Sequence, residues 1–362
     1  MTQKRKRKLT RRGYLVLALL LAAVLLFILS LVLFRPKEPT GEIETSPYAL
    51  DSSAEQRFAA MEGGLAVASG EGLQLFDEYG SLAARQTATM SRPAVSASGE
   101  YAAACDIGGV TLLTADMENG ITVHELANAV ISVRVLSDGW LAVCTESPGY
   151  KGMVTVYDDK FNVIYEWYSG EDYLLNADLS EDHELAVLCA GSGGSKIHIF
   201  TMNSETERGL YQAPEVLLDL HWVSGSRLAV LSDQRLVLLT DKAVQDVEYS
   251  FNGLHLYDYS VSDSGIFALA LSAYRSGGNT TLATISSSGK VLGEHTMEKL
   301  TGIDMRGKQV LVRGGSQLTL FNQQLEELRT TEIDAVGVQQ AILLKNGEAL
   351  LVYDYSAQAI PI

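Results

Sequence analysis

The side chains that could carry out chemistry are scattered through the sequence rather than gathered in a catalytic motif. The six histidines are His124, His183, His198, His221, His255 and His295. None stands in an H-x-H or H-E-x-x-H pair that would direct two ligands to one metal ion. The sequence also lacks the G-x-S-x-G turn of an activated serine and the G-x-x-x-x-G-K-S/T loop that cradles phosphates. We therefore expect no metal, no cofactor and no enzymatic activity.

Two further groups of reactive residues are assigned to structure. The acidic run at residues 181–184 lacks the alternating D-x-D-x-D-G pattern that surrounds a calcium ion, so we interpret it as a solvated turn. Cys105, Cys144 and Cys189 each follow a short apolar run, and no two of them form a C-x-x-C pair. A free cysteine in such a setting behaves as a small hydrophobe, and we predict three buried thiols without disulfides.

Aromatic and basic residues form the candidate binding site that the sequence offers. They are Tyr150, Lys151, Trp167, Tyr168, Tyr173, Tyr274 and Arg275. Exposed Tyr, Trp and Arg supply much of the contact energy at protein interfaces. The alternative is that most of these rings pack inside the fold, because aromatic residues favour strands. Neighbouring glycines favour loop positions for Tyr150 and Tyr274.

An uninterrupted apolar run precedes all of these residues and covers positions 14–34, from Tyr14 to Phe34. As a helix it would be about 30 Å long, which matches the hydrocarbon thickness of a bilayer. Seven Lys and Arg residues and no acid precede the run, and short basic flanks stay in the cytoplasm. We predict a single-pass signal-anchor with residues 1–13 inside and the rest outside. A cleaved secretory signal, the alternative, has a shorter apolar core followed by small residues.

The chain after the apolar run is strongly acidic. All 44 acids lie there against 21 of the 28 cations, which gives a formal charge of −23. Nucleic acid and anionic lipid are therefore poor partners for this part. Residues 35–56 are rich in Pro, Thr, Ser and Glu, and this composition predicts a spacer between the membrane and a folded domain.

From residue 57 onward the sequence repeats a turn followed by an apolar strand. Typical copies are SASGEYAAA from Ser96, LSDGWLAV from Leu136 and VSDSGIFALAL from Val261. The first strand residues of the eight copies stand at positions 65, 101, 141, 185, 228, 267, 310 and 349. A period of roughly 40 residues that holds four short strands is typical of β-propeller blades. We predict an all-β propeller of eight blades at residues 57–362, with seven blades as the alternative.

The S-x-D-G-x-x-L-A-V turn and strand resemble the repeats of WD40-like and TolB-like propellers, although no copy carries the Trp-Asp pair of true WD40 repeats. The order of basic tail, apolar span, spacer and propeller is similar to an uncharacterised bacterial family of membrane-anchored propellers. This resemblance implies a propeller over about residues 57–362 and implies no catalytic residue.

The eighth repeat has room for only three strands. An open sheet edge invites aggregation, and propellers are commonly closed when one terminus completes the blade begun by the other. We expect residues 43–50 to supply the missing outer strand. Pro47 fits this position because an outermost strand needs fewer backbone donors.

These elements bring the candidate residues toward one face of the propeller, where the second-to-third loops and the connections between blades emerge. We predict an extracytoplasmic, membrane-anchored recognition or scaffold module for a protein or a cell-envelope polymer. The alternative is an extracytoplasmic glycan-active hydrolase or lyase with carboxylates at the channel mouth. Such an enzyme needs two carboxyl groups about 5 to 10 Å apart.

Overall fold

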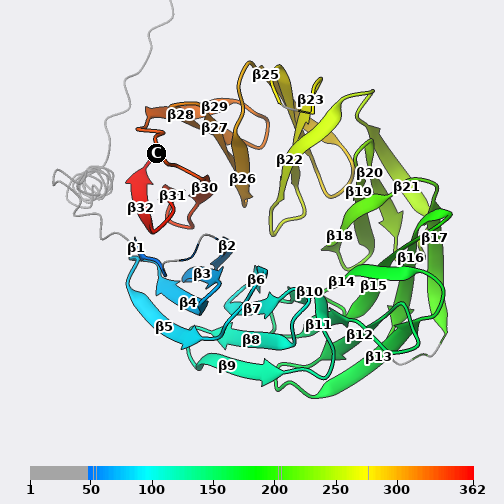
Figure 1. The fold of residues 1–362 in the computed structure, drawn as a ribbon. Helices are drawn as coiled ribbons and strands as arrows, with labels where there is room; N and C mark the ends of the chain where they lie inside the picture. Colours follow the sequence, from blue (N-terminus) through cyan, green and yellow to red (C-terminus); the bar gives the residue numbers. More distant parts are fainter. Residues whose placement is uncertain (1–47, 52, 54, 203, 205, 276) are drawn as a thin grey trace, which may run out of the picture. The chain divides into compact units, whose positions relative to one another are not determined.

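The computed structural model describes residues 48–51, 53, 55–202, 204, 206–275 and 277–362. Within these ranges, eight four-stranded antiparallel sheets form a ring, which is an eight-bladed β-propeller (Figure 1). The predicted all-β fold with eight blades is therefore confirmed. All described residues belong to one compact unit, Thr45–Ile362. Across the described ranges no helix has the length and apolarity needed to cross a bilayer, and the predicted span at residues 14–34 lies outside them.

Seven blades run in chain order from the centre of the ring to its rim. Blade 1 contains β2 (Gln56–Met61), β3 (Gly64–Ser69), β4 (Gly72–Asp77) and β5 (Leu82–Thr87). Blade 2 contains β6 (Pro93–Ser98), β7 (Tyr101–Asp106), β8 (Thr111–Asp116) and β9 (Gly120–Glu125). Blade 3 contains β10 (Val130–Val135), β11 (Leu141–Thr145), β12 (Gly152–Tyr157) and β13 (Val163–Ser169). Blade 4 contains β14 (Tyr173–Leu179), β15 (Glu184–Gly191), β16 (Gly194–Thr201) and β17 (Glu207–Ala213).

The remaining blades follow the same order. Blade 5 contains β18 (Leu217–Ser224), β19 (Arg227–Ser232), β20 (Arg235–Thr240) and β21 (Gln245–Ser250). Blade 6 contains β22 (His255–Val261), β23 (Phe267–Ser272), β24 (Thr280–Ile285) and β25 (Val291–Met297). Blade 7 contains β26 (Gly302–Arg306), β27 (Gln309–Gly314), β28 (Gln317–Asn322) and β29 (Glu327–Glu332). Blade 8 contains β30 (Gln340–Leu343), β31 (Glu348–Val352), β32 (Ser356–Pro361) and β1 (Tyr48–Ala49).

Blade 8 takes its outermost strand from the other end of the propeller sequence. In β1, Tyr48 pairs with Ala357 and Ala49 pairs with Ser356 of β32. The pairing lies within the segment 43–50 that was expected to close this blade, and residues 43–47 lie outside the described part. The Tyr48 ring is buried against Phe76 of blade 1, with ring centroids 5.2 Å apart. The first and last parts of the propeller chain therefore share one packed seam.

The apolar runs of the sequence form the second and third strands of each blade. Strands such as β11 and β23 are buried along their whole length, whereas outer strands such as β13 alternate between exposed and half-buried residues. The turns before the second strands follow from their glycines. Gly139 has φ +88°, and a Cβ there would lie 2.8 Å from the Tyr101 ring of blade 2. The recurring glycine thus serves both the tight turn and the contact with the preceding blade.

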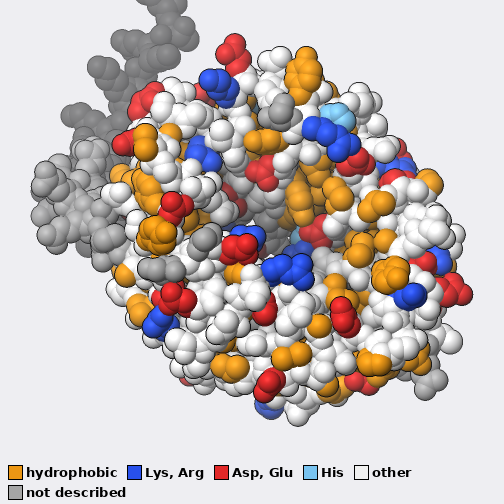
Figure 2. Space-filling model, viewed as in Figure 1, with side chains coloured by type: hydrophobic (Ala, Val, Ile, Leu, Met, Phe, Trp, Pro, Cys, Tyr) orange, Lys and Arg blue, Asp and Glu red, His pale blue; other side chains and the backbone are white. Residues whose placement is uncertain are grey.

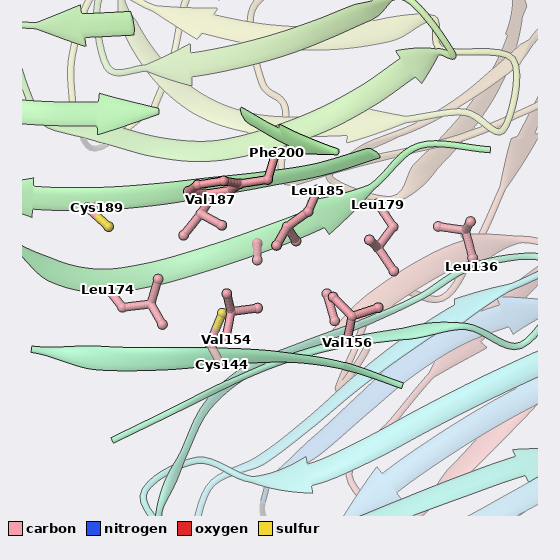
Figure 3. Close-up of a cluster of buried hydrophobic side chains, with 12 residues drawn as sticks. Leu136, Cys144, Val154, Val156, Leu174, Leu179, Leu185, Val187, Cys189 and Phe200 are labelled. Atoms are coloured by element: carbon pink, nitrogen blue, oxygen red, sulfur yellow. The ribbon is translucent and has the colours of Figure 1, made fainter. Parts of the chain in front are cut away.

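The core consists of eight apolar clusters in the described residues, and each lies between two neighbouring blades. Figure 3 shows the cluster between blades 3 and 4, where Val154 and Cys144 of blade 3 lie opposite the strand of blade 4 that carries Leu185, Val187 and Cys189. These two cysteines and Cys105 are buried free thiols, as predicted. Burial raises the pKa of the Cys144 thiol to about 12, so it packs as a neutral side chain.

Candidate functional site

The loops that carry the candidate binding residues leave the ring on one face. In an antiparallel blade, the second-to-third loop and the connection to the next blade emerge at the same sheet edge. Residues 146–151 join β11 to β12, residues 170–172 join blade 3 to blade 4, and residues 273–279 join β23 to β24. We call this face the loop face. The opposite face carries the turns between first and second strands and between third and fourth strands.

Four of the seven candidate residues meet at the junction of blades 3 and 4, and we call Tyr150, Lys151, Tyr168 and Tyr173 the tyrosine patch. The Tyr150 and Tyr168 ring centroids are 5.0 Å apart. Lys151 Nζ lies 4.7 Å from the centroid of the Tyr173 ring and donates to its hydroxyl at 3.4 Å. The side chains of Tyr150 and Tyr173 remain 52% and 61% exposed. The patch therefore offers aromatic surface that the protein itself does not cover.

The backbone beneath the tyrosine patch is tied to both blades. The Lys151 N–H donates to the Ser169 carbonyl at 2.7 Å, and the Leu174 N–H donates to the Lys151 carbonyl at 3.2 Å. Gly152 has φ +147°, and a Cβ there would lie 2.5 Å from Leu174 Cβ. Glycine is therefore required at the end of the β11–β12 loop, where the loop packs against Leu174 of blade 4. These contacts hold the patch in place before any partner binds.

Polar neighbours adjust the chemistry of one ring in the patch. The Tyr168 hydroxyl donates to Glu166 Oε2 at 3.3 Å. Partial burial and the negative charge of Glu166 raise the pKa of Tyr168. Tyr168 is therefore a neutral donor and contact surface at neutral pH, which suits recognition.

The structure separates the other three candidate residues from the patch. Trp167 is half-buried and packs against His198 and Phe200, with ring centroids 5.0 and 5.2 Å away. It belongs to the core between blades 3 and 4. Tyr274 and Arg275 are exposed on the β23–β24 loop of blade 6, where Tyr274 is 62% exposed. They share the loop face with the patch but lie two blades further along the ring.

Sequence reasoning missed a polar arrangement at the centre of the ring. The strand registers place one equivalent residue in the innermost strand of each blade: Ala59, Ser96, Arg134, Asp178, His221, Ser260, Asp304 and Ile342. We call this the channel position. Six of the eight line an inner cavity of about 270 Å³. Figure 2 shows a face of the ring that is hollowed near its centre, with basic and acidic side chains at the rim of the hollow.

Four channel-position side chains hold the neighbouring blade. Each accepts a hydrogen bond from the backbone N–H of the residue that follows the channel position in the next blade. The bonds join Ser96 Oγ to Val135 N (3.2 Å), Asp178 Oδ2 to Trp222 N (2.8 Å), Ser260 Oγ to Met305 N (2.9 Å) and Asp304 Oδ2 to Leu343 N (2.7 Å). Burial raises the pKa of Asp178 and of Asp304. These side chains therefore connect blades and replace water as backbone partners.

The other large polar side chains at the channel position converge on Asp219, a buried residue of β18. Its carboxylate is hydrogen-bonded by Arg134 Nη2 (2.8 and 2.9 Å), Asn176 Nδ2 (2.7 Å), His221 Nε2 (3.0 Å) and the Tyr259 hydroxyl (2.6 Å). These partners come from blades 3, 4, 5 and 6, and we call the five residues the Asp219 network. Burial raises the pKa of Asp219, but the charges of His221 and Arg134 outweigh it and hold the pKa well below its usual range.

The geometry of the central acids favours structure over catalysis. Asp258 also accepts a backbone bond from the next blade, since its Oδ2 takes the Ile303 N–H at 3.0 Å. Among the described residues no three His, Cys, Asp or Glu side chains stand together as metal ligands. The tyrosine patch therefore offers exposed aromatic surface, whereas the Asp219 carboxylate already accepts hydrogen bonds from four side chains.

The model of a family of unknown function, DUF5711, matches residues 40–360. The chain belongs to DUF5711. No curated protein matches the DUF5711 chain. Solved propellers resemble it at low sequence identity. The C-terminal WD40 domain of Sif2 is 11% identical with a TM-score of 0.60, over 87% of the DUF5711 chain and 98% of that domain.

Two further solved structures also resemble the DUF5711 chain at low sequence identity. A eukaryotic initiation factor is 13% identical with a TM-score of 0.58, over 84% of the DUF5711 chain and 83% of that structure. Streptogramin B lyase is also 13% identical with a TM-score of 0.50, over 74% of the DUF5711 chain and 92% of the lyase. At such identities the likeness concerns the β-propeller fold alone.

Proposed function

We propose that this DUF5711 protein is a non-enzymatic, extracytoplasmic recognition module that docks a protein partner on its tyrosine patch and is anchored in the cytoplasmic membrane by residues 14–34. The observation that carries the proposal is the patch itself, with exposed rings on a backbone bonded to two blades. Tyrosine supplies large contact area at a low cost in conformational entropy. The WD40-like fold supports this role, since rigid propellers position loops for recognition.

The enzymatic alternative was a glycan-active hydrolase or lyase with paired carboxylates at the channel mouth. Such chemistry needs two carboxyl groups that are free to exchange protons or to attack the sugar. Asp178, Asp258 and Asp304 each accept a backbone N–H from the next blade, and Asp219 is saturated by side-chain donors. These bonds favour recognition over catalysis as the function of the propeller.

The patch is tested by crosslinking in intact cells. We expect the full chain to capture one protein, and Tyr150→Ala with Tyr173→Ala to abolish the capture without lowering the melting temperature. Tyr355→Ala is the matched control, because Tyr355 is 63% exposed in the second-to-third turn of blade 8. Undiminished capture by the folded double variant contradicts the docking site, and capture of a glycan polymer in place of a protein contradicts the partner class.

The membrane topology is tested separately. Protease added outside spheroplasts should digest the propeller and leave residues 1–13 protected, because the seven cations before residue 14 favour the cytoplasmic side. A propeller that is protected while a periplasmic or secreted control protein is digested contradicts the extracytoplasmic location. This result would leave the tyrosine patch to be judged by the crosslinking experiment alone.

A further inference from the structure

The face opposite to the tyrosine patch carries a second concave site, which lies beside the turns between first and second strands. Blades 1, 2 and 7 join these strands by two residues each, at 62–63, 99–100 and 307–308, and blade 8 uses four, 344–347. Residues of all four turns line a hollow on this face.

Side-chain contacts hold the turns of blades 3 and 4 together on the same face. Trp140 stacks on His183 with ring centroids 3.9 Å apart, and His183 Nε2 lies 2.7 Å from Asp138 Oδ2. The hollow is lined by residues of blades 1, 2, 6, 7 and 8 and by none of these three side chains.

The hollow is a cavity of about 520 Å³, and we call it the mouth pocket. Its charged lining residues are Glu62, Asp263, Arg306, Lys308 and Lys345. Ala60, Asp263, Arg306 and Leu343 also line the inner cavity at the channel position, so the two cavities adjoin. The volume falls within the range of roughly 300 to 1,000 Å³ that small-molecule sites occupy.

The charge of the mouth pocket contrasts with that of the whole chain, whose formal charge is −16. Three cations from blades 7 and 8 line it against two acids. A neighbouring cavity between blades 2 and 3 is lined by Asp116, Asp158 and Asp159 and by no Lys or Arg among the described residues. The clustering of cations is thus a local property of the mouth pocket.

Two of the three cations form a hydrogen bond or an ion pair within the described residues, and the third, Lys308, forms no ion pair there. Arg306 Nη2 donates to the Met61 carbonyl at 2.9 Å, which leaves its other guanidinium donors for a second partner. Lys345 forms an ion pair with Glu62 across the seam between blades 8 and 1, and this pair lowers the pKa of Glu62. Lys308 is exposed and forms no ion pair within the described residues.

We propose that the mouth pocket binds a small molecule through a phosphate or carboxylate group. Arg306 presents a planar fork that matches either oxyanion, while Lys308 and Lys345 supply point charges on the same rim. The remainder of the ligand extends toward the adjoining inner cavity, whose wall includes Ala59 and Ile342. The site lies on the face opposite to the tyrosine patch, so it does not depend on the proposed docking function.

The Glu62–Lys345 pair provides the sharpest test, because both single substitutions break the same ion pair. Glu62→Gln removes an acid that competes with the ligand and should tighten binding by about threefold. Lys345→Gln removes a ligand contact and should weaken binding by about tenfold, as should Lys308→Gln. A purely structural role of the pair predicts effects of the same sign. Changes in affinity of opposite sign therefore identify the mouth pocket as the site.

The measurement is isothermal titration calorimetry of the detergent-solubilised full chain with inorganic pyrophosphate and with citrate at constant ionic strength. Lys290→Gln is the matched control, since Lys290 is an exposed lysine on the same face in the β24–β25 turn of blade 6. Saturable binding of pyrophosphate alone assigns a phosphate ligand, and binding of citrate alone assigns a carboxylate ligand. Absence of saturable binding overturns the proposal. Binding that Lys308→Gln and Lys345→Gln leave unchanged also overturns it, because the seven cations before residue 14 would then account for the signal.

Discussion

The two halves of the inner wall close the ring in different ways. In blades 3 to 6, polar side chains cross the centre and meet at Asp219, which Arg134 reaches from two blades away. In blades 8 and 1, the channel position holds Ile342 and Ala59, which line the inner cavity together with residues of blades 2, 3, 6 and 7. Blades 3 to 6 are thus joined by a hydrogen-bond network at the centre, which we call the closed half, whereas blades 8 and 1 present small or apolar side chains to a cavity, which we call the open half.

This difference shows how one strand position can serve two purposes. Long side chains such as Arg134 and His221 reach a shared acceptor and fill the centre with satisfied polar groups. Ala59 and Ile342 have no polar side-chain atom with which to bridge blades, and the seam between blades 8 and 1 is packed by an apolar cluster that includes Tyr48. The side chain at the channel position therefore decides where the propeller is held from within and where it retains space for a ligand.

The largest effect is expected when the network loses its shared acceptor. Asp219→Ala should lower the free energy of unfolding by about 4 kcal/mol, because Arg134 is left as a charge without its buried partner. Denaturant unfolding of the full chain in detergent measures the loss. Asp246→Ala is the matched control, since Asp246 pairs with Arg227 in the same blade with about a third of each side chain exposed. It should cost less than about 1 kcal/mol.

Equal losses in the free energy of unfolding for the two aspartate substitutions would contradict the special role of Asp219. It would mean that Asp219 contributes no more than a surface ion pair. A large loss of stability for Asp219→Ala and a small loss for Asp246→Ala would support the role of Asp219 as the shared acceptor of the network.

The open half is expected to depend on its outer strand. Tyr48→Ala should lower the free energy of unfolding by about 3 kcal/mol, because it empties a buried site between blades 8 and 1. Tyr48→Phe should retain most of the stability, since the ring fills the site. Tyr79→Ala is the control, because Tyr79 is 75% exposed. An unchanged melting temperature for Tyr48→Ala would show that the seam closes without β1.

The repeat made most of the fold predictable from the sequence. Eight turn-and-strand copies marked the second strand of every blade, and each blade has the four strands expected of it. The three-stranded last copy indicated closure from the N-terminal side, where Tyr48–Ala49 pairs with β32. Such local patterns succeed because strand and turn signals depend on neighbours in sequence.

The candidate site was predictable only where neighbouring segments determine it. Tyr150 and Tyr168 meet because a loop and a strand end of one blade adjoin, whereas Trp167, next to Tyr168, points into the core. The Asp219 network could not be predicted, because its members lie in four blades and their convergence depends on the radius of the ring. A signal was present, since polar residues such as Arg134 and Asp178 recur at one position of apolar strands.

The smallest expected effect is the pH dependence of the stability that two aspartates, Asp219 and Asp304, contribute. Asp219 has a lowered pKa in the folded protein, so its contribution is complete above about pH 4 and is lost as the pH falls further. The stability difference between the wild type and Asp219→Asn should therefore be constant near neutral pH and shrink in acid. Asp304 has a raised pKa, so its charged form carries a cost at neutral pH that disappears on protonation.

The Asp304→Asn variant should consequently show the opposite trend. Its amide oxygen can still accept the Leu343 N–H, so at pH 7 it should differ from the wild type by less than about 1 kcal/mol. As the pH falls toward 4 the wild type gains stability by protonating Asp304, while the variant cannot, and the difference should grow. Denaturant unfolding of both variants between pH 7 and pH 3 measures the two slopes. Slopes of the same sign would mean that protonation of Asp219 and of Asp304 changes the stability in the same direction. The charged partners of Asp219 would then not distinguish it from the other acids of the inner wall.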